Sequence, residues 1–166
     1  GFRPTFPQAI VAALRAGWQY RTTVVWNENN VSSQIHFNFP AAPHIIAPVE
    51  MIAWLYKGEW SQKDKASRQH DLTDEEWREW KTGVWTFPGE SKPYHGHPAP
   101  FPIELPHRLI KLLSYPGDTV LDPFIGSGTT AIAAYRLGRK CYGFDISKEY
   151  VQVARQRLAE EAGLWK

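Results

Sequence analysis

A glycine-rich turn in the last third of the chain has the residue types and spacing of a nucleotide-binding loop. Gly126, Gly128 and Ala131 follow the pattern G-x-G-x-x-A, directly after an apolar run and before a helical one. The glycines allow a sharp turn and let a ligand approach the backbone, and the alanine permits close packing of helix on strand. The amides of Thr129 and Thr130 at the start of the helix can bind a negatively charged group. The pattern therefore predicts a site for a nucleotide-like ligand.

Two aspartates flank this turn and narrow the class of ligand. Asp145 lies 19 positions after Gly126 (145 − 126 = 19), close to the spacing of about 20 residues at which an acid reaches a ribose diol. Asp122 stands just before the turn, where a carboxylate would repel a pyrophosphate and attract an ammonium group. S-adenosylmethionine carries an ammonium, a carboxylate and a ribose, so charge complementarity favours it over a dinucleotide. The alternative for Asp122 is a structural role in capping a turn, as aspartates often have.

The surrounding sequence predicts the elements that position these residues. An apolar strand is expected over 119–124, a helix over 129–137 ended by Gly138, and a second strand over 140–145, after which Ser147 caps a final helix. Strand, glycine turn, helix, strand and helix make half of a doubly wound α/β sheet.

A helix and a turn are predicted immediately before this unit. Pro106 fits the first turn of the helix, and Tyr115 to Asp118 has proline and glycine in the order typical of a type II turn. The helix carries a stripe of leucines: Leu105, Leu109, Leu112 and Leu113.

The first half of the chain has weaker signals. A short helix is expected from Thr5 to the stop at Gly17, and strands over 20–26 and 49–56, with a loop over 30–48.

A further helix is expected in the middle of the chain. Thr73 and Glu76 form a capping box for a helix that runs to about Lys81, on which Trp77 and Trp80 are expected to pack rather than stack on bases. Six prolines from Pro88 to Pro106 predict an extended connection.

Composition sets limits on the class of protein. The 166 residues are 43% hydrophobic and 22% charged, with a mean hydropathy of −0.43, which argues against both a membrane protein and a disordered one. A single cysteine, Cys141, excludes an internal disulfide and fits a reducing cytoplasm. The formal charge of +2 is compatible with a nucleic-acid partner but does not by itself indicate one. The histidines and Cys141 match no metal-ligand spacing, so no metal is expected.

Five segments of the sequence, which together cover nearly the whole chain, resemble one family. Two of them, GWQYRTTVVWNENN (17–30) and DLTDEEWREWKTGVW (71–85), are similar to a late strand of its catalytic domain and to a helix shortly before its proline-rich motif. LDPFIGSGTT (121–130) and GFDISKEYVQVARQRL (143–158) are similar to the first two cofactor motifs of prokaryotic amino-group DNA methyltransferases, and HPAPFPIELPHRLI (97–110) is similar to the cofactor motif that precedes them. This order is typical of the permuted arrangement, in which the catalytic motif comes first. The resemblance implies a Rossmann-like doubly wound α/β sheet with helices on both faces and a short helical or loop insertion.

The resemblance also implies cofactor contacts and a domain division. The methionine end of S-adenosylmethionine would be bound by Asp122, Phe124, Gly126, Ser127, Gly128, Thr129 and Thr130; Asp145 and Ile146 would hold ribose and adenine; His97, Phe101 and Pro102 would wall the pocket. Residues 1–56 would be the late part of a catalytic subdomain, 57–92 an insertion that contacts the target, and 93–166 the cofactor subdomain.

The reaction that the resemblance implies is methyl transfer to the N6 of adenine or the N4 of cytosine in double-stranded DNA, on a base flipped out of the duplex. The family's catalytic motif contains two adjacent prolines, which this chain lacks, so we expect no catalytic residue here and place that motif upstream of Gly1. Lys63, Lys65 and Arg68 lie where the family recognises its target and could contact phosphates, or they could form an ordinary solvated loop.

Other functions and partners stay open at this stage. The same cofactor motifs would suit a methyltransferase acting on RNA or a small molecule, and a catalytically inactive nucleic-acid-binding module is a third possibility. A cognate restriction endonuclease and a second copy of the chain are conceivable partners, and no membrane partner is expected.

Overall fold

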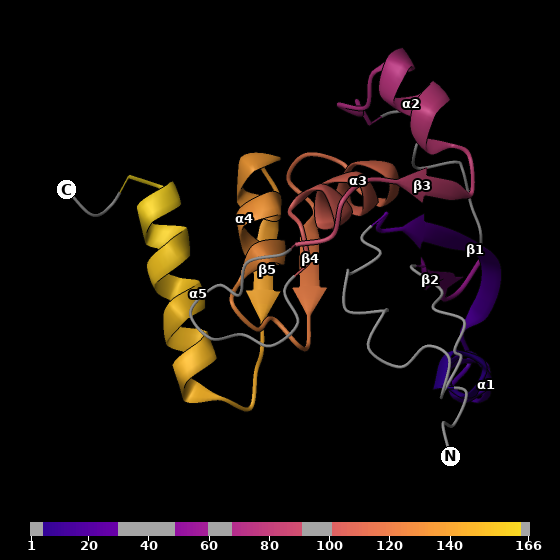
Figure 1. Cartoon of the computed structure of the whole chain (residues 1–166), viewed down its shortest axis with the longest axis horizontal. Helices are drawn as coiled ribbons and strands as arrows, with labels where there is room; N and C mark the ends of the chain where they lie inside the picture. Colours follow the sequence, from indigo (N-terminus) through magenta and orange to yellow (C-terminus); the bar gives the residue numbers. More distant parts are fainter. Residues whose placement is uncertain (1–4, 30–48, 60–67, 91–100, 164–166) are drawn as a thin grey trace, which may run out of the picture. The chain divides into compact units, whose positions relative to one another are not determined.

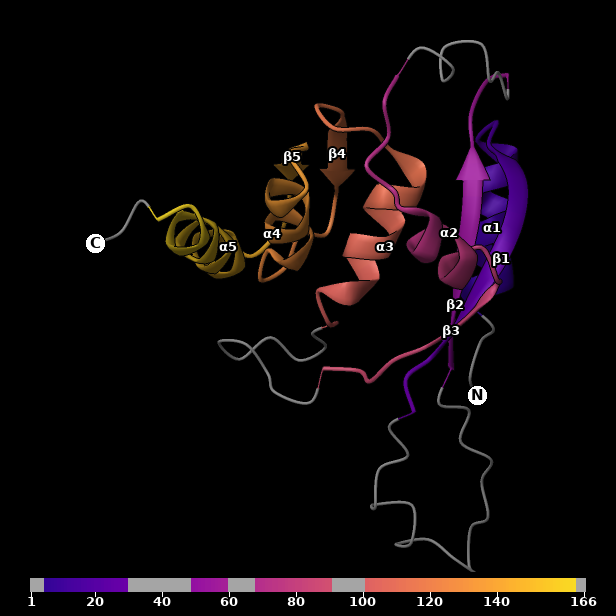
Figure 2. The ribbon, with the colours of Figure 1, turned by 90° about the horizontal axis from the view of Figure 1, so that it is seen from above.

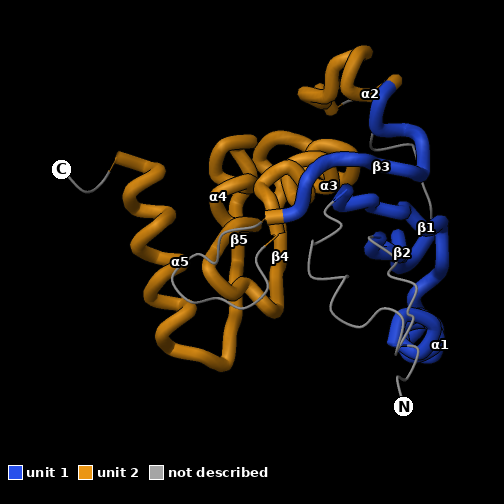
Figure 3. The backbone as a smooth tube through the Cα atoms, in the orientation of Figure 1, with its two compact units in different colours: residues 1–64, 79–89 blue, residues 65–78, 90–166 orange. Residues whose placement is uncertain are grey.

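The computed structural model describes residues 5–29, 49–59, 68–90 and 101–163 of the chain. These residues form two compact units (Figures 1 and 3): unit 1 comprises residues 1–64 and 79–89, and unit 2 comprises residues 65–78 and 90–166. The segment 57–92, expected to be an insertion, thus contributes residues to both units. The loop expected over 30–48 lies outside the described residues.

Unit 1 contains a helix and a three-stranded sheet. Helix α1 (Thr5–Arg15) precedes strands β1 (Gln19–Asn27), β2 (Val49–Tyr56) and β3 (Val84–Thr86), and the strand order is β2-β1-β3. Strand β1 pairs antiparallel with β2 and parallel with β3. The helix and the first two strands confirm the sequence predictions, and Gly17 ends the helix with a positive φ of 85°. The sequence did not predict β3, which has three residues.

Tryptophans form the core of unit 1. Trp85 is the largest fully buried side chain, and its indole donates to the backbone oxygen of Trp80 at 3.0 Å. Trp26 stacks on Phe87 with 5.1 Å between ring centroids and donates to the Phe87 carbonyl. Both indole N–H groups thus have acceptors, as buried tryptophan requires. Trp80 packs as expected, but the same prediction is wrong for Trp77, which is 51% exposed.

Unit 2 contains the predicted strand–helix–strand–helix order. Its elements are α3 (Glu104–Leu113), β4 (Thr119–Asp122), α4 (Thr129–Arg136), β5 (Lys140–Gly143) and α5 (Lys148–Glu161), preceded by the first residues of α2 (Asp74–Trp80). Strands β4 and β5 are parallel, with Asp122 opposite Gly143. Helices α3, α4 and α5 lie along one side of the two strands (Figure 2).

The core of unit 2 lies between helices and sheet. Ile110 of α3 packs against Ala133 and Ala134 of α4, and Val120 and Cys141 from the two strands lie against this cluster. Leu121 and Tyr142, which alternate with them along the strands, are 64% and 61% exposed. The leucine stripe of α3 is not the buried face: the residues that the helix buries are Pro106, Arg108 and Ile110, while Leu105, Leu109 and Leu112 are half-buried and Leu113 is exposed. Pro106 and Ile110 are four residues apart and share a helical face.

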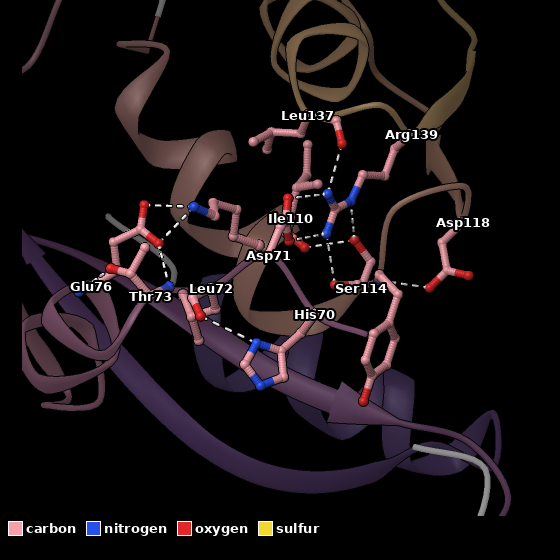
Figure 4. A network of polar contacts seen from close by, with 12 residues as sticks. His70, Asp71, Leu72, Thr73, Glu76, Ile110, Ser114, Asp118, Leu137 and Arg139 are labelled. Atoms are coloured by element: carbon pink, nitrogen blue, oxygen red, sulfur yellow. Dashed lines mark hydrogen bonds and ion pairs between the residues drawn. The ribbon is translucent and has the colours of Figure 1, made fainter. Parts of the chain in front are cut away.

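A buried arginine attaches the segment that leads into α2 to the rest of unit 2 (Figure 4). The side chain of Arg139 is fully buried, and its guanidinium makes two hydrogen bonds to the carboxylate of Asp71, at 2.5 and 2.9 Å. Its other N–H groups donate to Leu137 O, Ser114 O and Ser114 Oγ. All five donors of this guanidinium therefore have acceptors, the condition under which a buried charge is tolerated.

Two further ion pairs hold the same segment. Lys111 Nζ lies 2.6 Å from both oxygens of Glu76, whose Oε2 also accepts from the Thr73 amide, and Thr73 Oγ1 accepts from the Glu76 amide in return. These contacts confirm the predicted capping box. Arg68 pairs with Asp118 at 2.5 Å and lies 4.5 Å from the centroid of the Tyr115 ring.

The three ion pairs lower the pKa of their carboxyl groups. Burial alone would raise the pKa of Asp71, Glu76 and Asp118, but the hydrogen bonds and charges of Arg139, Lys111 and Arg68, respectively, outweigh it. These carboxylates therefore stabilise the folded state wherever they are ionised.

The turn that leads into β4 is also as predicted. Gly117 has a φ of 85°, and the Asp118 amide donates to the Tyr115 carbonyl at 3.0 Å. Among the described residues, no helix is long and apolar enough to cross a bilayer.

Replacing Asp71 should destabilise unit 2. In Asp71→Asn, the fully buried guanidinium of Arg139 keeps its charge but loses its counter-ion, which we expect to cost about 2–4 kcal/mol because Asp71 is itself only partly exposed. Thermal unfolding of the purified chain measures the change. Glu161→Gln, which breaks the more exposed pair with Arg136, is the matched control and should shift the melting temperature much less. Equal shifts for the two variants would contradict the role given to Arg139.

The stabilisation by Asp71 should depend on pH in one direction. Its pKa is lowered on folding, so its contribution is fully present above about pH 4.5 and is lost as the pH falls through the folded-state value. The difference in melting temperature between wild type and Asp71→Asn should thus be constant from about pH 7 to about pH 5 and shrink below about pH 4. A difference that grows on acidification would show that the pair is not the source.

Candidate functional site

The candidate site lies at the edge of the sheet where β4 and β5 both end. The backbone continues the pairing beyond the strands: the Phe144 amide donates to Asp122 O at 2.9 Å, and the Ile125 amide donates to Phe144 O at 2.8 Å. The glycine turn and the segment after β5 are therefore fastened side by side. This edge is formed by the carboxyl ends of parallel strands, which is where open α/β sheets bind ligands.

Asp145 connects the turn to the final helix. Its Oδ2 accepts from the Gly126 amide at 3.0 Å and its Oδ1 from the Ser147 amide at 2.8 Å. Ser147 caps α5 as predicted, its hydroxyl accepting from the Tyr150 amide. Asp145, the residue predicted to bind the ribose, thus also has a structural role. A carboxylate offers about four acceptor positions, so two amides leave capacity for further donors.

Asp122 makes a local turn contact. Its Oδ1 accepts from the Phe124 amide at 2.9 Å, which is the turn-capping arrangement considered as the alternative. Asp122 is half-buried; Gly143, opposite it on β5, carries no side chain, and Phe124, two residues further on, is 85% exposed. Ile146, which is predicted to contact the ribose or adenine, is fully exposed.

Two glycines at the site are required by close packing. A Cβ on Gly128, whose φ is 89°, would lie 2.8 Å from Cβ of Ala154 in α5, so this helix and not a ligand occupies the space that the sequence reasoning gave to a ligand. A Cβ on Gly143 would lie 2.6 Å from Ile125. Sequence reasoning missed Gly143, because nothing in its neighbours along the chain signals the approach of Ile125.

Arg157 of α5 is the second residue that sequence reasoning missed. Its Nη1 donates to Ser127 O at 2.6 Å and to Ser127 Oγ at 3.0 Å, and lies 3.4 Å from Thr129 Oγ1. The predicted cofactor residues Ser127 and Thr129 are 5% and 8% exposed, so the Ser127 hydroxyl faces Arg157 inside the protein. The one available signal was spacing, since Arg157 lies three residues after Ala154 on the same side of α5.

The other predicted cofactor residues are distributed around this turn. Phe101 and Thr129 line one cavity of about 530 Å³, together with Arg136 and Arg157. Asp145 lines a different hollow, of about 440 Å³, with Lys148 and Arg155. Thr130 and Pro102 are half-buried, Gly126 is buried, and His97 lies outside the described residues.

Two of the three predicted DNA contacts, Lys63 and Lys65, lie outside the described residues. The third, Arg68, has the intramolecular partners Asp118 and Tyr115. Within the described ranges, no group of three His, Cys, Asp or Glu side chains is placed to hold a metal ion. Cys141 is half-buried, and burial together with the charge of Asp122 raises the pKa of its thiol, as expected for a packing residue.

Comparison with known proteins assigns the family. A family model for N6/N4 methyltransferases, described as "DNA methylase", matches residues 3–156. The chain is 44% identical over 95 residues to the type II methyltransferase M.MjaVI of Methanocaldococcus jannaschii, covering 55% of this chain and 48% of that protein. It is 34% identical over 157 residues to M.Cfr9I of Citrobacter freundii, covering 93% and 50%. The chain thus spans about half the length of these relatives.

A solved structure gives the same assignment for the fold. TTHA0409 of Thermus thermophilus, named as a candidate DNA modification methylase and solved in complex with S-adenosyl-L-methionine, superposes with a TM-score of 0.73 at 30% identity. The superposition covers 95% of this chain and 60% of that one. The predicted Rossmann-like methyltransferase fold is therefore confirmed, and the chain belongs to the family of N6- and N4-directed DNA methylases.

Proposed function

We propose that the protein to which this chain belongs transfers a methyl group from S-adenosylmethionine to the N6 of adenine or the N4 of cytosine in double-stranded DNA. The proposal rests on one observation at the carboxyl ends of the parallel strands β4 and β5. There, Asp145 accepts a hydrogen bond from the Gly126 amide and so holds the glycine turn that follows Asp122. Family membership and the type II methyltransferases among the relatives support it.

The residues at this edge fit the cofactor. The first amides of α4 have no acceptor within their own helix, and Gly128, the N-cap residue, has no side chain that could accept a hydrogen bond from them. They suit the carboxylate of an amino acid, while the Asp122 carboxylate suits its ammonium group. Asp145 has acceptor capacity for ribose hydroxyls, and the exposed side chains of Phe124 and Ile146 offer apolar surface.

In this proposal the chain supplies binding and orientation. When bound, S-adenosylmethionine supplies an electrophilic methyl group on its sulfonium. Asp122, Asp145 and the α4 amides would fix the two ends of the cofactor and so direct the methyl group. The catalytic motif, which would accept hydrogen bonds from the amine of the flipped base, is proposed to lie outside this chain, consistent with the chain spanning about half of its relatives.

The remaining assignments belong to the proposal as well. Lys63, Lys65 and Arg68 would contact DNA phosphates, and residues 1–56, 57–92 and 93–166 would serve as catalytic, target-contacting and cofactor-binding parts. A cognate restriction endonuclease and a second copy of the chain are the proposed protein partners, in the cytoplasm.

Ligand choice and substrate choice test the proposal separately. Titration calorimetry of the chain should show binding of S-adenosylmethionine and none of NAD, because Asp122 would repel a pyrophosphate. The full-length protein should then transfer tritiated methyl groups to unmethylated DNA. A preference for NAD would contradict the cofactor, transfer to RNA alone would support an RNA methyltransferase, and DNA binding without transfer would indicate an inactive module.

Asp145→Ala should weaken cofactor binding. The variant removes the predicted ribose contacts and also frees the Gly126 amide, and each charged hydrogen bond is worth about 1.5–3 kcal/mol. We expect the Kd for S-adenosylmethionine, measured by calorimetry, to rise at least about tenfold. Glu75→Gln, which removes an exposed carboxylate from α2, is the control and should leave the Kd unchanged. An unchanged Kd in Asp145→Ala would refute the assignment.

A further inference from the structure

Arg157 of α5 makes several contacts with the glycine turn. A single guanidinium nitrogen lies within 2.6–3.4 Å of three oxygens that belong to Ser127 and Thr129. Thr129 is the first residue of α4, so these contacts reach from the middle of the turn to the start of the helix. Both residues are buried, whereas Arg157 itself is half-buried.

The turn needs external support to keep one conformation. It contains two glycines with positive φ, 48° at Gly126 and 89° at Gly128, and glycine loses more conformational freedom on folding than any other residue. Asp145 holds the Gly126 amide. Arg157 holds the carbonyl and hydroxyl of Ser127, the residue between the two glycines, so two neighbouring residues of the turn are each held by a side chain from outside it.

The same helix also packs directly against the glycine turn. Ala154 of α5 meets the backbone of Gly128, and Arg157 follows one turn later. The position of α5 along the turn is thereby fixed, and the guanidinium places a full positive charge beside the start of α4. This charge adds to the partial positive charge that the helix already has at its N-terminus.

We propose that Arg157 is a positioning residue for the carboxylate end of the cofactor. It does not touch the ligand; it holds the Ser127 carbonyl and the hydroxyls of Ser127 and Thr129, so that the first amides of α4 point at the carboxylate. This inference rests on the proposed function, because it takes the ligand to be a nucleoside that carries an amino acid. The inference assigns the two ends of that ligand to different residues. Arg157 binds Ser127 and Thr129, near the proposed carboxylate end, whereas Asp145, the proposed ribose contact, binds Gly126 and Ser147.

A second arginine provides a matched control. Arg136 of α4 also joins the two helices, through hydrogen bonds of 2.7 and 2.8 Å to Glu161 of α5. This pair lies at the far ends of both helices, about two turns from the glycine turn. Arg136→Gln therefore loosens the contact between α4 and α5 without freeing Ser127.

The test compares two nucleosides that differ in the amino acid. S-adenosylhomocysteine has the carboxylate and 5′-methylthioadenosine lacks it, and both can be titrated by calorimetry into wild type, Arg157→Gln, Arg157→Lys and Arg136→Gln. We expect Arg157→Gln to raise the Kd for S-adenosylhomocysteine about tenfold and to leave that for methylthioadenosine unchanged. Arg157→Lys, which keeps the charge and can reach one oxygen, should give a smaller rise, and Arg136→Gln should change neither Kd.

Each result decides the inference. An equal rise for both nucleosides in Arg157→Gln, or no rise for either, would overturn it. If Arg157→Gln does not fold, judged by circular dichroism, the same comparison in Arg157→Lys decides the question. Wild type that binds neither nucleoside would refute the proposed function itself, which is a different outcome from wild type that binds both while the variants fail to discriminate.

Discussion

The geometry of the candidate site depends on the two hydrogen bonds that the carboxylate of Asp145 accepts. The donors are the amides of Gly126 and Ser147, so the glycine turn and the start of α5 are tied to one group. Helix α5 then returns to the turn through Ala154 and Arg157. The turn is consequently shaped by the element that follows β5 at least as much as by the strand that leads into it, although the glycine motif itself belongs to β4 and α4.

A second constraint, the burial of Arg139, decides where the segment before α2 belongs. Its composition alone is that of a solvated basic loop with an acidic helix start. Asp71 and Glu76, however, pair with Arg139 and Lys111, which lie 68 and 35 positions further along the chain. A fully buried guanidinium is costly without such a partner. The start of α2 is therefore part of unit 2, while residues 79–89 belong to unit 1.

The sequence predicts those features whose signals lie within a few residues of each other. The capping box at Thr73, the cap at Ser147, the Pro-Gly turn at Gly117 and the strand–turn–helix order from 119 to 161 are of this kind. The rest depends on residues that meet only after folding. Gly143 must be small because Ile125 approaches it, Arg157 finds Ser127 across 30 positions, and β3 is too short to show a period.

The two interpretations of Asp122, ligand contact and turn cap, are compatible. Its Oδ1 accepts from the Phe124 amide, and this contact fixes the direction of the carboxylate without neutralising its charge. A group held in this way is oriented before any ligand arrives, which lowers the entropic cost of binding. In the proposed function, its charge would still distinguish an ammonium from a diphosphate. The turn contact is thus the means by which the edge of the sheet presents a fixed negative charge a few residues before the positive end of α4, and that pair of opposite charges matches an amino acid better than a pyrophosphate.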